Sequence, residues 1–574
     1  MEASGTARWT QAWRDSAERR WKVAPVAVVA VACALAVGAG WDNSATNDEP
    51  YHTLAAFAYT HDGHGDLNVE HPPLVKLVAG AALLPLRLRG SEAPPVLRLA
   101  VLSEEVRRFL YFNIASAETI LRAARLAQLP FLVLLLTGVY AWSRWALGRN
   151  AALLALLAVA FQPLVLGHAF VVHTDVAAAA GWTWSLFLLH RWLAGWRAGW
   201  LPVGAVLGLS LLIKFSAVYL VPLAAIAVLV ASLRSRRYRD LVRLAGVCVV
   251  ALVVVLAGMA IPLRNGDLAE EQATIGTTLG LWPGTGRIVR SLQAVAEVNR
   301  PLAHYALGLA YVYETNLHGQ GINFFLGRTD VGGFALYFPA ALLLKTSLPF
   351  LVMVGLGLFG AARSRDRTDA FLLLPALYYL AISFNTSYNI GARHLLPMIP
   401  LLAMAGARHA AALGRLLRLG LGVCLVASAA LSFPHYLAHF SLLIGGAGHG
   451  GRYLNDSNLD WGQDWARLAR EAARRGWRPM AYVYLGAGNP HHDMPEAVDA
   501  LDSATPPHGG FLAVSSYAAA VGVAYLRALR YRNEAARLDG LLELARDQGT
   551  VAGEVGHTIT VYRLPGPRPQ VPPT

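Results

Sequence analysis

Long apolar segments recur through most of this chain, and they constrain its fold more than any other feature. Several approach the roughly 20 residues that a helix needs to cross a membrane. The chain is 55% hydrophobic and only 15% charged, which is too apolar for a soluble protein of this size. We therefore predict a mainly α, polytopic membrane protein. About eleven transmembrane helices are expected, at residues 23–40, 118–141, 150–168, 176–193, 198–213, 216–233, 241–262, 335–360, 370–384, 395–412 and 415–433.

Short clusters of arginine separate alternate apolar segments and indicate the orientation of the chain. They fall at residues 144–149, 191–197, 234–243, 363–367 and 408–418. If the basic N-terminal segment 8–22 is cytoplasmic, every cluster is cytoplasmic too, as the positive-inside rule requires. The pattern predicts a multi-pass protein of the cytoplasmic (inner) membrane, with a retained signal anchor at 23–40. Because these loops account for the formal charge of +13, no nucleic-acid partner is expected.

The polar segments on the other side of the membrane divide the chain into regions. Residues 1–433 are expected to form a transmembrane domain with two long outer loops, at 41–117 and 263–334. Residues 434–574 are expected to form a small external α/β domain. There, strand-like segments at 480–486, 510–517 and 557–564 alternate with helical stretches. The proline-rich end at 564–574 is expected to be disordered.

The first outer loop concentrates acids and histidines directly after the first span, in DNSATNDEPYHTLAAFAYTHDGHGDLNVEHPPLVKL (42–77). Asn47 and Asp48 are typical of an N-cap, which predicts a helix through Thr60. In that helix Asp48 and His52 are four residues apart and share a face. A second helix is expected from Pro72 along the membrane surface. Asp48 therefore has two interpretations, a helix cap or a functional carboxylate that faces a pocket.

Two further charged residues lie at the outer ends of spans, where a charge near hydrocarbon needs a reason. Asp175 follows a very short outer turn and could line a pocket with Asp48, or cap its own helix. Lys214 has apolar residues on both sides and no acid close in sequence. It either binds an anion at the depth of the lipid headgroups or extends to the interface.

Arginines also lie at outer span ends, against the positive-inside trend. Arg122 and Arg125 could hold a phosphate or pair with acids of the first outer loop. Arg393, followed by His394, could hold an anion or act as an interfacial anchor. Together with the acids, these residues predict an outward-facing cavity at the border of the lipid. Such a site suits a substrate with an anionic headgroup and a tail in the bilayer.

Several of these segments resemble, in the same order, a known class of membrane enzymes. The segments are NDEPYH (47–52), EHPPLVKL (70–77), RAARLAQL (122–129), HTDVA (173–177), GLSLLIK (208–214) and YNIGARHLLPMIP (388–400). They look like those of the GT-C glycosyltransferases of family 39 and its relatives, the protein O-mannosyltransferases and the bacterial lipid A aminoarabinose transferases. The resemblance covers roughly residues 1–430, and DSNLDWGQDWARLAR (456–470) resembles a segment of bacterial relatives.

The resemblance implies a GT-C fold and an inverting hexosyl- or pentosyltransferase on the outer face of the membrane. The donor would be a polyprenyl phosphate-linked sugar, and the acceptor a hydroxyl or phosphate of a glycan, lipid or protein. The leaving phosphate needs cations more than a protonating acid, and one carboxylate suffices as general base. The catalytic residues implied are Asp48 as base, with Glu49 and Asp175. The phosphate ligands implied are Lys214, Arg125, Arg122 and Arg393. The substrate pocket would hold His52, Glu70, His71, His173, His318, Arg328 and His394.

No cofactor is required by these residues, although a divalent metal ion is compatible with them. Glu70 and His71 match a position where some relatives place a metal ligand or a donor contact. Two neighbouring ligands do not make a site, so His52 or His318 would have to join them. Cys33, Cys248 and Cys424 lie in apolar segments, so neither a disulfide nor a thiolate metal site is expected.

Two other interpretations remain open at this stage. A transporter or flippase of a lipid-linked sugar would bind the same phosphate, but such proteins usually show internal repeats, and none is evident in the sequence. In DSNLDWGQDW (456–465), the side chains of Asp456, Asp460, Trp461 and Gln463 could contact a sugar. Alternatively, this segment is a helix cap with a tryptophan that packs in a core.

Overall fold

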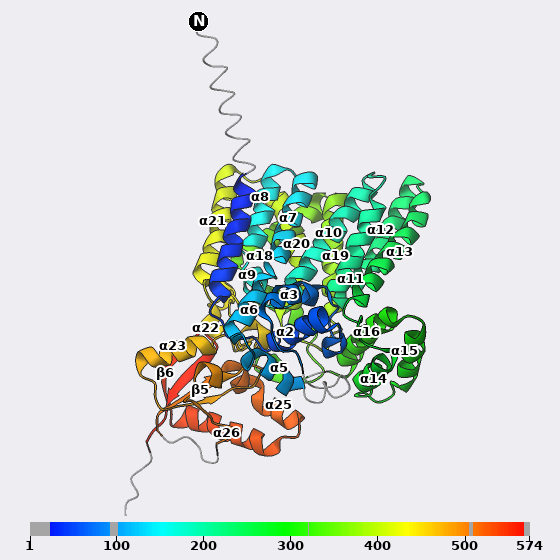
Figure 1. Ribbon diagram of the computed structural model, residues 1–574. Coiled ribbons are helices and arrows are strands. Elements are labelled where there is room, and N and C mark those ends of the chain that lie inside the picture. Colours follow the sequence, from blue (N-terminus) through cyan, green and yellow to red (C-terminus); the bar gives the residue numbers. More distant parts are fainter. Residues whose placement is uncertain (1–22, 92–101, 320, 365, 504–508, 567–574) are drawn as a thin grey trace, which may run out of the picture.

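Long helices stand side by side in one layer, and the other elements lie at one end of it (Figure 1). The computed structural model describes residues 23–91, 102–319, 321–364, 366–503 and 509–566. The basic segment 8–22 and most of the proline-rich end lie outside the described residues.

The layer of long helices, here called the helical layer, contains the predicted spans, except that the span at 118–141 begins in α6 (Ala117–Leu126), outside this layer. Each span coincides with one helix or with two consecutive helical segments. The layer consists of the helix Val23–Gly40, α7 (Leu129–Ala146), α8 (Arg149–Ala160), α9 (Pro163–Ala169), α10 (Asp175–Leu193), α11 (Trp200–Ile213), α12 (Leu220–Ser235), α13 (Arg239–Ala260), α17 (Tyr337–Lys345), α18 (Leu348–Ser364), α19 (Arg367–Ser383), α20 (Ile399–Ala410) and α21 (Arg415–Ser432). Most side chains of α10 are buried between its neighbours, which places this helix near the centre.

The number of membrane spans is less well defined than the helices themselves. Within the described chain, five helices are long and apolar enough to cross a membrane, or seven if each bent pair counts as one span. The bent pairs are α8 with α9, at 59°, and α17 with α18, at 119°. Helices α11 and α20, of 14 and 12 residues, are shorter than a full span. The polytopic membrane fold is confirmed, while the count of eleven stays a prediction.

Shorter helices form a second layer against one end of the helical layer, here called the loop layer. It consists of α2 (Glu49–Phe57), a π-helical turn (Ala58–Asp62), α3 (Leu74–Leu83), α5 (Leu102–Tyr111), α6 (Ala117–Leu126), α14 (Leu268–Leu279), α15 (Gly286–Val298) and α16 (Arg300–His318). Helices α2, α3, α5 and α6 share a hydrophobic core of their own. A hairpin of β1 (Asn323–Phe325) and β2 (Arg328–Asp330) follows α16. The first long loop therefore carries helices, as predicted, and the second carries helices that were not predicted.

Short 3-10 turns connect the layers at several points. They are Asp66–Asn68, Leu84–Leu86, Phe215–Tyr219, Ala392–Met398, Leu442–Ile444 and Asp456–Asn458. The turn Ala392–Met398 leads directly into α20 and carries Arg393 and His394. The turn Phe215–Tyr219 follows Lys214, whose extended backbone ends α11.

The C-terminal region is an α/β unit at the same end of the molecule as the loop layer (Figure 1). Its five-stranded sheet has the order β4-β3-β5-β7-β6. The elements are α22 (Ala447–Gly450), α23 (Trp465–Arg475), β3 (Met480–Val483), α24 (Pro490–Asp493), β4 (Val498–Asp499), β5 (Phe511–Ser515), α25 (Val523–Ala528), α26 (Arg532–Asp547), β6 (Thr550–Val555) and β7 (Ile559–Arg563). Strand β3 pairs in parallel with β4 and β5, whereas β7 is antiparallel to β5 and β6.

Alternate residues of the strands fill two cores, one on each face of this sheet. Val483 and Leu512 face α25 and α26, whereas Tyr482 and Ala513 face α23. This period of two is what a strand requires when both of its faces are buried. The three predicted strands correspond to β3, β5 and β7, and β4 and β6 extend the sheet on either side.

Candidate active site

Four charged residues and one histidine, from four separate segments of the chain, meet where α2, α10 and the turn Ala392–Met398 come together. Arg393 Nη1 donates to Asp48 Oδ2 at 3.0 Å and to His173 Nε2 at 2.6 Å. His173 Nδ1 lies 2.7 Å from Asp175 Oδ2, and Lys214 Nζ donates to Asp175 Oδ1 at 2.5 Å. Asp48, Asp175, Lys214 and Arg393 thus form one network, as the sequence predicts.

The local backbone explains why Asp48 is available to this network. Asp48 occupies the N-cap position of α2, but its side chain makes no capping hydrogen bond. Pro50, in the first turn, has no N–H that would need such a bond. The carboxylate instead accepts from Arg393, so Asp48 is not a capping side chain of α2.

A cavity of about 600 Å³ opens beside this network. Seven of the predicted residues line it: Asp48, His52, Glu70, His71, His173, Arg393 and His394. Further lining comes from α14, from the turn that follows it and from α16, through Thr277, Thr278, Leu281 and Tyr311. Asp175 and Lys214 are buried directly behind His173. The site is therefore built by both long loops and by the ends of several helices of the helical layer.

The pKa values of the two acids that line the cavity, Asp48 and Glu70, are shifted in opposite directions. Burial alone would raise the pKa of Asp48, but the charge of Arg393 and the contact with His173 bring it well below its usual range. Burial and the nearby charge of Asp48 raise the pKa of Glu70. Two carboxyl groups with displaced pKa values in one cavity are a common property of sites that move protons.

Glu49 and Arg125 form a closed pair outside the cavity. Arg125 Nε and Nη2 donate to the Glu49 carboxylate at 2.7 and 2.6 Å, and both side chains are buried. The remaining hydrogen bonds of Arg125 go to the carbonyl oxygens of Gly40, Asn43 and Ser44. The guanidinium is thus fully engaged with the first loop, which favours the pairing interpretation over phosphate binding for Arg125. Glu49, although next to Asp48, points away from the cavity.

Three other predicted residues lie away from the cavity lining. Arg122 stacks on the Trp41 ring at 4.8 Å and meets Asp42 at 3.4 Å. His318, at the end of α16, contacts Glu314 of the same helix. Arg328 is exposed on β2. The structure therefore does not bring Arg122, His318 and Arg328 together with Asp48.

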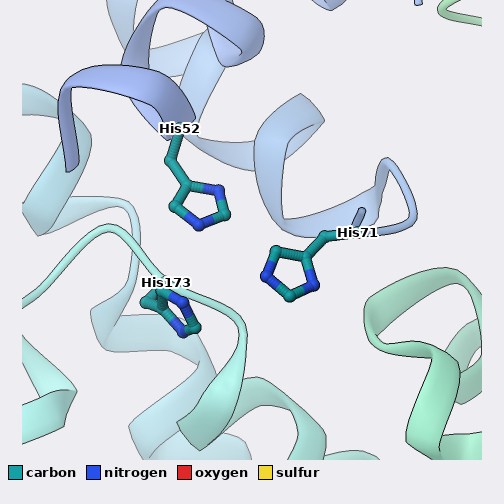
Figure 2. Close-up of side chains that lie close together, drawn as sticks. All are labelled: His52, His71 and His173. Atoms are coloured by element: carbon teal, nitrogen blue, oxygen red, sulfur yellow. The ribbon is translucent and has the colours of Figure 1, made fainter. Parts of the chain in front are cut away.

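Three histidines at the cavity form a group that could hold a metal ion (Figure 2). One ring nitrogen from each of His52, His71 and His173 lies within 4.8 Å of the others. Imidazole is a preferred ligand of zinc, at about 2.0–2.1 Å, so the rings would have to move closer around one ion. His173 Nε2 already accepts from Arg393, so an ion there would compete with that contact. His71 is thus joined by His52, as expected, while Glu70 is not part of this group.

Two residues with a role at the site were not singled out from the sequence. Lys76 on α3 is buried and donates to the carbonyl oxygens of Asn68 and His71, each at 2.6 Å. It therefore fixes the turn that carries Glu70 and His71. Tyr388 lines the cavity beside Arg393. A lysine inside an apolar helix was the signal for Lys76, the same signal that identified Lys214.

Trp461, in the segment DSNLDWGQDW, was interpreted either as a sugar contact or as a packing residue. Trp461 is buried, and its ring packs over the Arg393 guanidinium at 4.4 Å. It also meets the ring of His173 edge-on, at 5.7 Å. Trp461 is therefore a packing residue, but the group that it packs against belongs to the site.

Comparisons with known proteins agree with this fold. The family model described as dolichyl-phosphate-mannose-protein mannosyltransferase matches residues 111–259. No curated protein sequence matches the chain. The crystal structure of ArnT from Cupriavidus metallidurans bound to undecaprenyl phosphate is similar, with a TM-score of 0.50 and 14% identity, covering 95% of this chain and 99% of that one. The apo state of that protein aligns with a TM-score of 0.48 and 15% identity, over the same shares of the two chains.

A more distant match is the oligosaccharyltransferase of Archaeoglobus fulgidus in its apo form. It has a TM-score of 0.44 and 12% identity, covering 82% of this chain and 63% of that one. The ArnT structure shows the fold, and the family model falls on the segment from the end of α5 to α13. Together these findings confirm the GT-C fold and the predicted resemblance to family-39-like glycosyltransferases.

Proposed function

We propose that this chain is a membrane glycosyltransferase that moves a hexosyl or pentosyl group from a polyprenyl phosphate donor to a hydroxyl or phosphate of a glycan, lipid or protein acceptor. One observation carries the proposal: Asp48 and Arg393, 345 residues apart, meet at 3.0 Å on the wall of a large cavity at one end of the helical layer. A carboxylate and a guanidinium at that position supply a base and a phosphate ligand for such a transfer.

The donor fits the cationic side of this cavity. The Arg393 guanidinium lines the wall, and the Lys214 ammonium lies behind His173. A guanidinium matches phosphate oxygens well, and charge that develops on a departing phosphate is stabilised by cations already in place. The ArnT structure was solved with undecaprenyl phosphate, and the matching family model is described by a dolichyl phosphate sugar. Both support a polyprenyl phosphate donor.

Asp48 is placed to act as the general base. The acceptor oxygen attacks the anomeric carbon from the side opposite the phosphate, so the configuration inverts. The bond to the phosphate oxygen breaks, polyprenyl phosphate leaves, and the acceptor proton passes to Asp48. In the free protein Arg393 weakens this carboxylate as a base, because a low pKa means low basicity. A donor phosphate that draws Arg393 toward itself raises the basicity of Asp48 at the moment when the base is needed.

A divalent ion would be held by His52, His71 and His173 and would add positive charge next to the donor phosphate. The steps assigned to Asp48 and Arg393 do not require it. We further place the site and the C-terminal α/β domain on the outer face of the cytoplasmic membrane, with the N-terminus inside. The arginine-rich loops predicted on the opposite side support this orientation.

Replacement of Asp48 by asparagine tests the proposal. Membranes that contain the protein are incubated with radiolabelled polyprenyl phosphate sugars, both hexosyl and pentosyl. We expect Asp48→Asn to lower the transfer rate by at least about 100-fold, because the base is lost. Donor binding should persist, because Arg393 and Lys214 remain. Asp42→Asn is the matched control, since Asp42 lies in the same loop, is exposed and pairs with Arg122.

Two results would contradict this proposal. Full activity of Asp48→Asn would show that Asp48 is not the general base. Wild-type membranes that transfer none of the sugars but move the labelled lipid between leaflets would show a flippase instead of a transferase.

A further inference from the structure

We propose that Trp461, contributed by the C-terminal α/β domain, is a positioning residue of the active site. Its indole holds the guanidinium of Arg393 in the orientation that meets Asp48 and leaves the other nitrogens for an anion. The inference rests on the proposed function, in which Arg393 binds the donor phosphate.

The contact between the two side chains is close and shielded from water. The Arg393 guanidinium carbon lies 4.4 Å from the centre of the Trp461 ring. Both residues are only 3% exposed. Attraction between a cation and an aromatic face is strongest when neither group is solvated. The indole is therefore a principal partner of this guanidinium and not an incidental neighbour.

Arg393 depends on this contact because its hydrogen bonds run through a single nitrogen. Within the described residues, Nη1 makes the bonds to Asp48 and His173, and Nη1 is also the atom nearest to Asp175, at 3.7 Å. Nε is buried and has no hydrogen-bond partner. A planar group held at one corner can still turn about that corner. The face of Trp461 fixes the plane, and so determines where the remaining nitrogens point.

The main chain around Trp461 also holds the residue before Asp48. The Asn47 amide donates to the Trp461 carbonyl oxygen at 2.8 Å, and the Ser44 amide donates to the Gln463 carbonyl oxygen at 3.0 Å. The side chain of Asn47 accepts from the Ala487 amide at 2.7 Å. The segment that supplies the indole thus also anchors the start of α2.

The same segment supports the chain next to Arg393. Ser457 Oγ donates to the Ile390 carbonyl oxygen at 2.6 Å, and the Ala392 amide donates to Asn458 Oδ1 at 2.9 Å. Both members of the Asp48–Arg393 pair are therefore set by residues 457–463. The C-terminal domain thus contributes directly to the geometry of the active site.

The test compares three variants of the full-length protein in lipid nanodiscs with a polyprenyl phosphate sugar as donor. Trp461→Leu removes the aromatic face, and Trp461→Phe keeps one. Trp477→Leu is the matched control, because Trp477 is also buried in this domain and packs against Arg475 and Phe511, outside the cavity. We expect Trp461→Leu to raise the donor KM about tenfold with a smaller change in kcat. Trp461→Phe should recover most of the affinity, and Trp477→Leu should lower the melting temperature without changing KM.

Binding of undecaprenyl phosphate, measured in parallel, tests the contact without any transfer. Weaker binding by Trp461→Leu, with near-normal binding by Trp461→Phe and Trp477→Leu, supports the positioning role. If all three variants bind alike, or if Trp461→Phe fails as badly as Trp461→Leu, the role is overturned. If the binding pattern is as expected but the wild type transfers no sugar, the proposed reaction fails while the positioning role stands.

Discussion

Asp456 shows how the burial of a single acid links protonation to stability. It lies five residues before Trp461, in the 3-10 turn Asp456–Asn458, with a left-handed φ of 60°. Burial raises its pKa to about 7, and the nearby charge of Arg393 offsets only part of this. Burial raises the pKa of Asp460 as well, to about 6. The segment thus holds two acids that resist ionisation in the folded protein.

The raised pKa of Asp456 predicts a pH-dependent stability. An aspartate in the unfolded chain has a pKa near 3.9. The folded protein therefore binds the proton more tightly, and the resulting stabilisation is complete below about pH 4 and lost as the pH rises through about 7. We expect Asp456→Asn to unfold at a higher temperature than the wild type at pH 8, with the difference fading toward pH 5. Thermal unfolding of detergent-solubilised protein across this range measures the effect.

The exposed Asp502 provides the control for this experiment. Asp502→Asn should change the unfolding temperature at pH 8 much less than Asp456→Asn does. An Asp456→Asn variant whose advantage does not change with pH would show that the carboxyl group is not the cause.

Residues of this site could be predicted from the sequence only where a charged side chain lies at the end of an apolar span, since placing a charge near hydrocarbon is costly. Asp48, Lys214 and Arg393 were found because charges at the ends of apolar spans need a reason. Arg125 has the same appearance in the sequence, yet its donors all meet acceptors of residues 40–49. Only the folded loop shows that every hydrogen-bond donor group of Arg125 already has an acceptor, which leaves none for a phosphate. The link between Trp461 and Arg393 joins residues of two domains, so no spacing could indicate it.

At the level of elements, the close contact between α2 and α3 helps to place two histidines of the cavity lining. Gly80 of α3 faces α2 so closely that a Cβ there would overlap the Ala56 carbonyl oxygen and Thr60 Oγ1. Helix α2 carries His52, and Lys76 of α3 fixes the turn with His71; these two imidazoles stack at 5.2 Å. The separation of the two helices therefore also affects the separation of two imidazoles that line the cavity.

A methyl group at Gly80 should separate the two helices. We expect Gly80→Ala to destabilise the protein by about 1–3 kcal/mol, the usual cost of overpacking, and to weaken donor binding. Gly276→Ala is the control, because a Cβ at Gly276 of α14 would meet only Gln293, at 3.9 Å. That change should be neutral or stabilising by up to about 1 kcal/mol. Chemical denaturation and lipid-binding titrations measure both quantities, and equal results for the two variants would contradict the packing argument.

Secondary-structure elements could be predicted from the sequence where hydrophobicity alone determines that a helix forms. The predicted spans coincide with helices because a run of apolar residues near a bilayer has few alternatives to a helix. The bends between α8 and α9 and between α17 and α18 were not predicted, since each needs neighbouring helices to hold it. Strand β6 was missed because it is largely exposed and is irregular between Val551 and Gly553. Strand β6 forms because its backbone can pair with the otherwise unpaired edge of β7.

On the scale of the whole molecule, one buried lysine ties the helical layer to the C-terminal domain. Lys345 ends α17, and its ammonium donates to the carbonyl oxygens of Leu437, His439 and Asn458. Leu437 and His439 lie where the chain leaves α21, and Asn458 belongs to the segment that reaches the active site. The ammonium also lies over the Phe440 ring, 4.3 Å from its centre. The end of α17, next to its bend into α18, thus contacts both the chain that leaves α21 and the segment that contains Asn458.

Replacement of Lys345 by methionine should therefore impair the site from a distance. Methionine keeps much of the apolar stem but leaves three carbonyl oxygens without this donor, and an unpaired buried acceptor costs about 1–3 kcal/mol. We expect Lys345→Met to keep its helical circular dichroism, to be cleaved faster by protease between residues 434 and 460, and to transfer sugar more slowly. Arg452→Met, at an exposed position of the same segment, is the control. Identical cleavage rates in the two variants would mean that other contacts hold the C-terminal domain against the helical layer. Identical transfer rates would mean that the hydrogen bond between Lys345 and Asn458 does not influence Arg393.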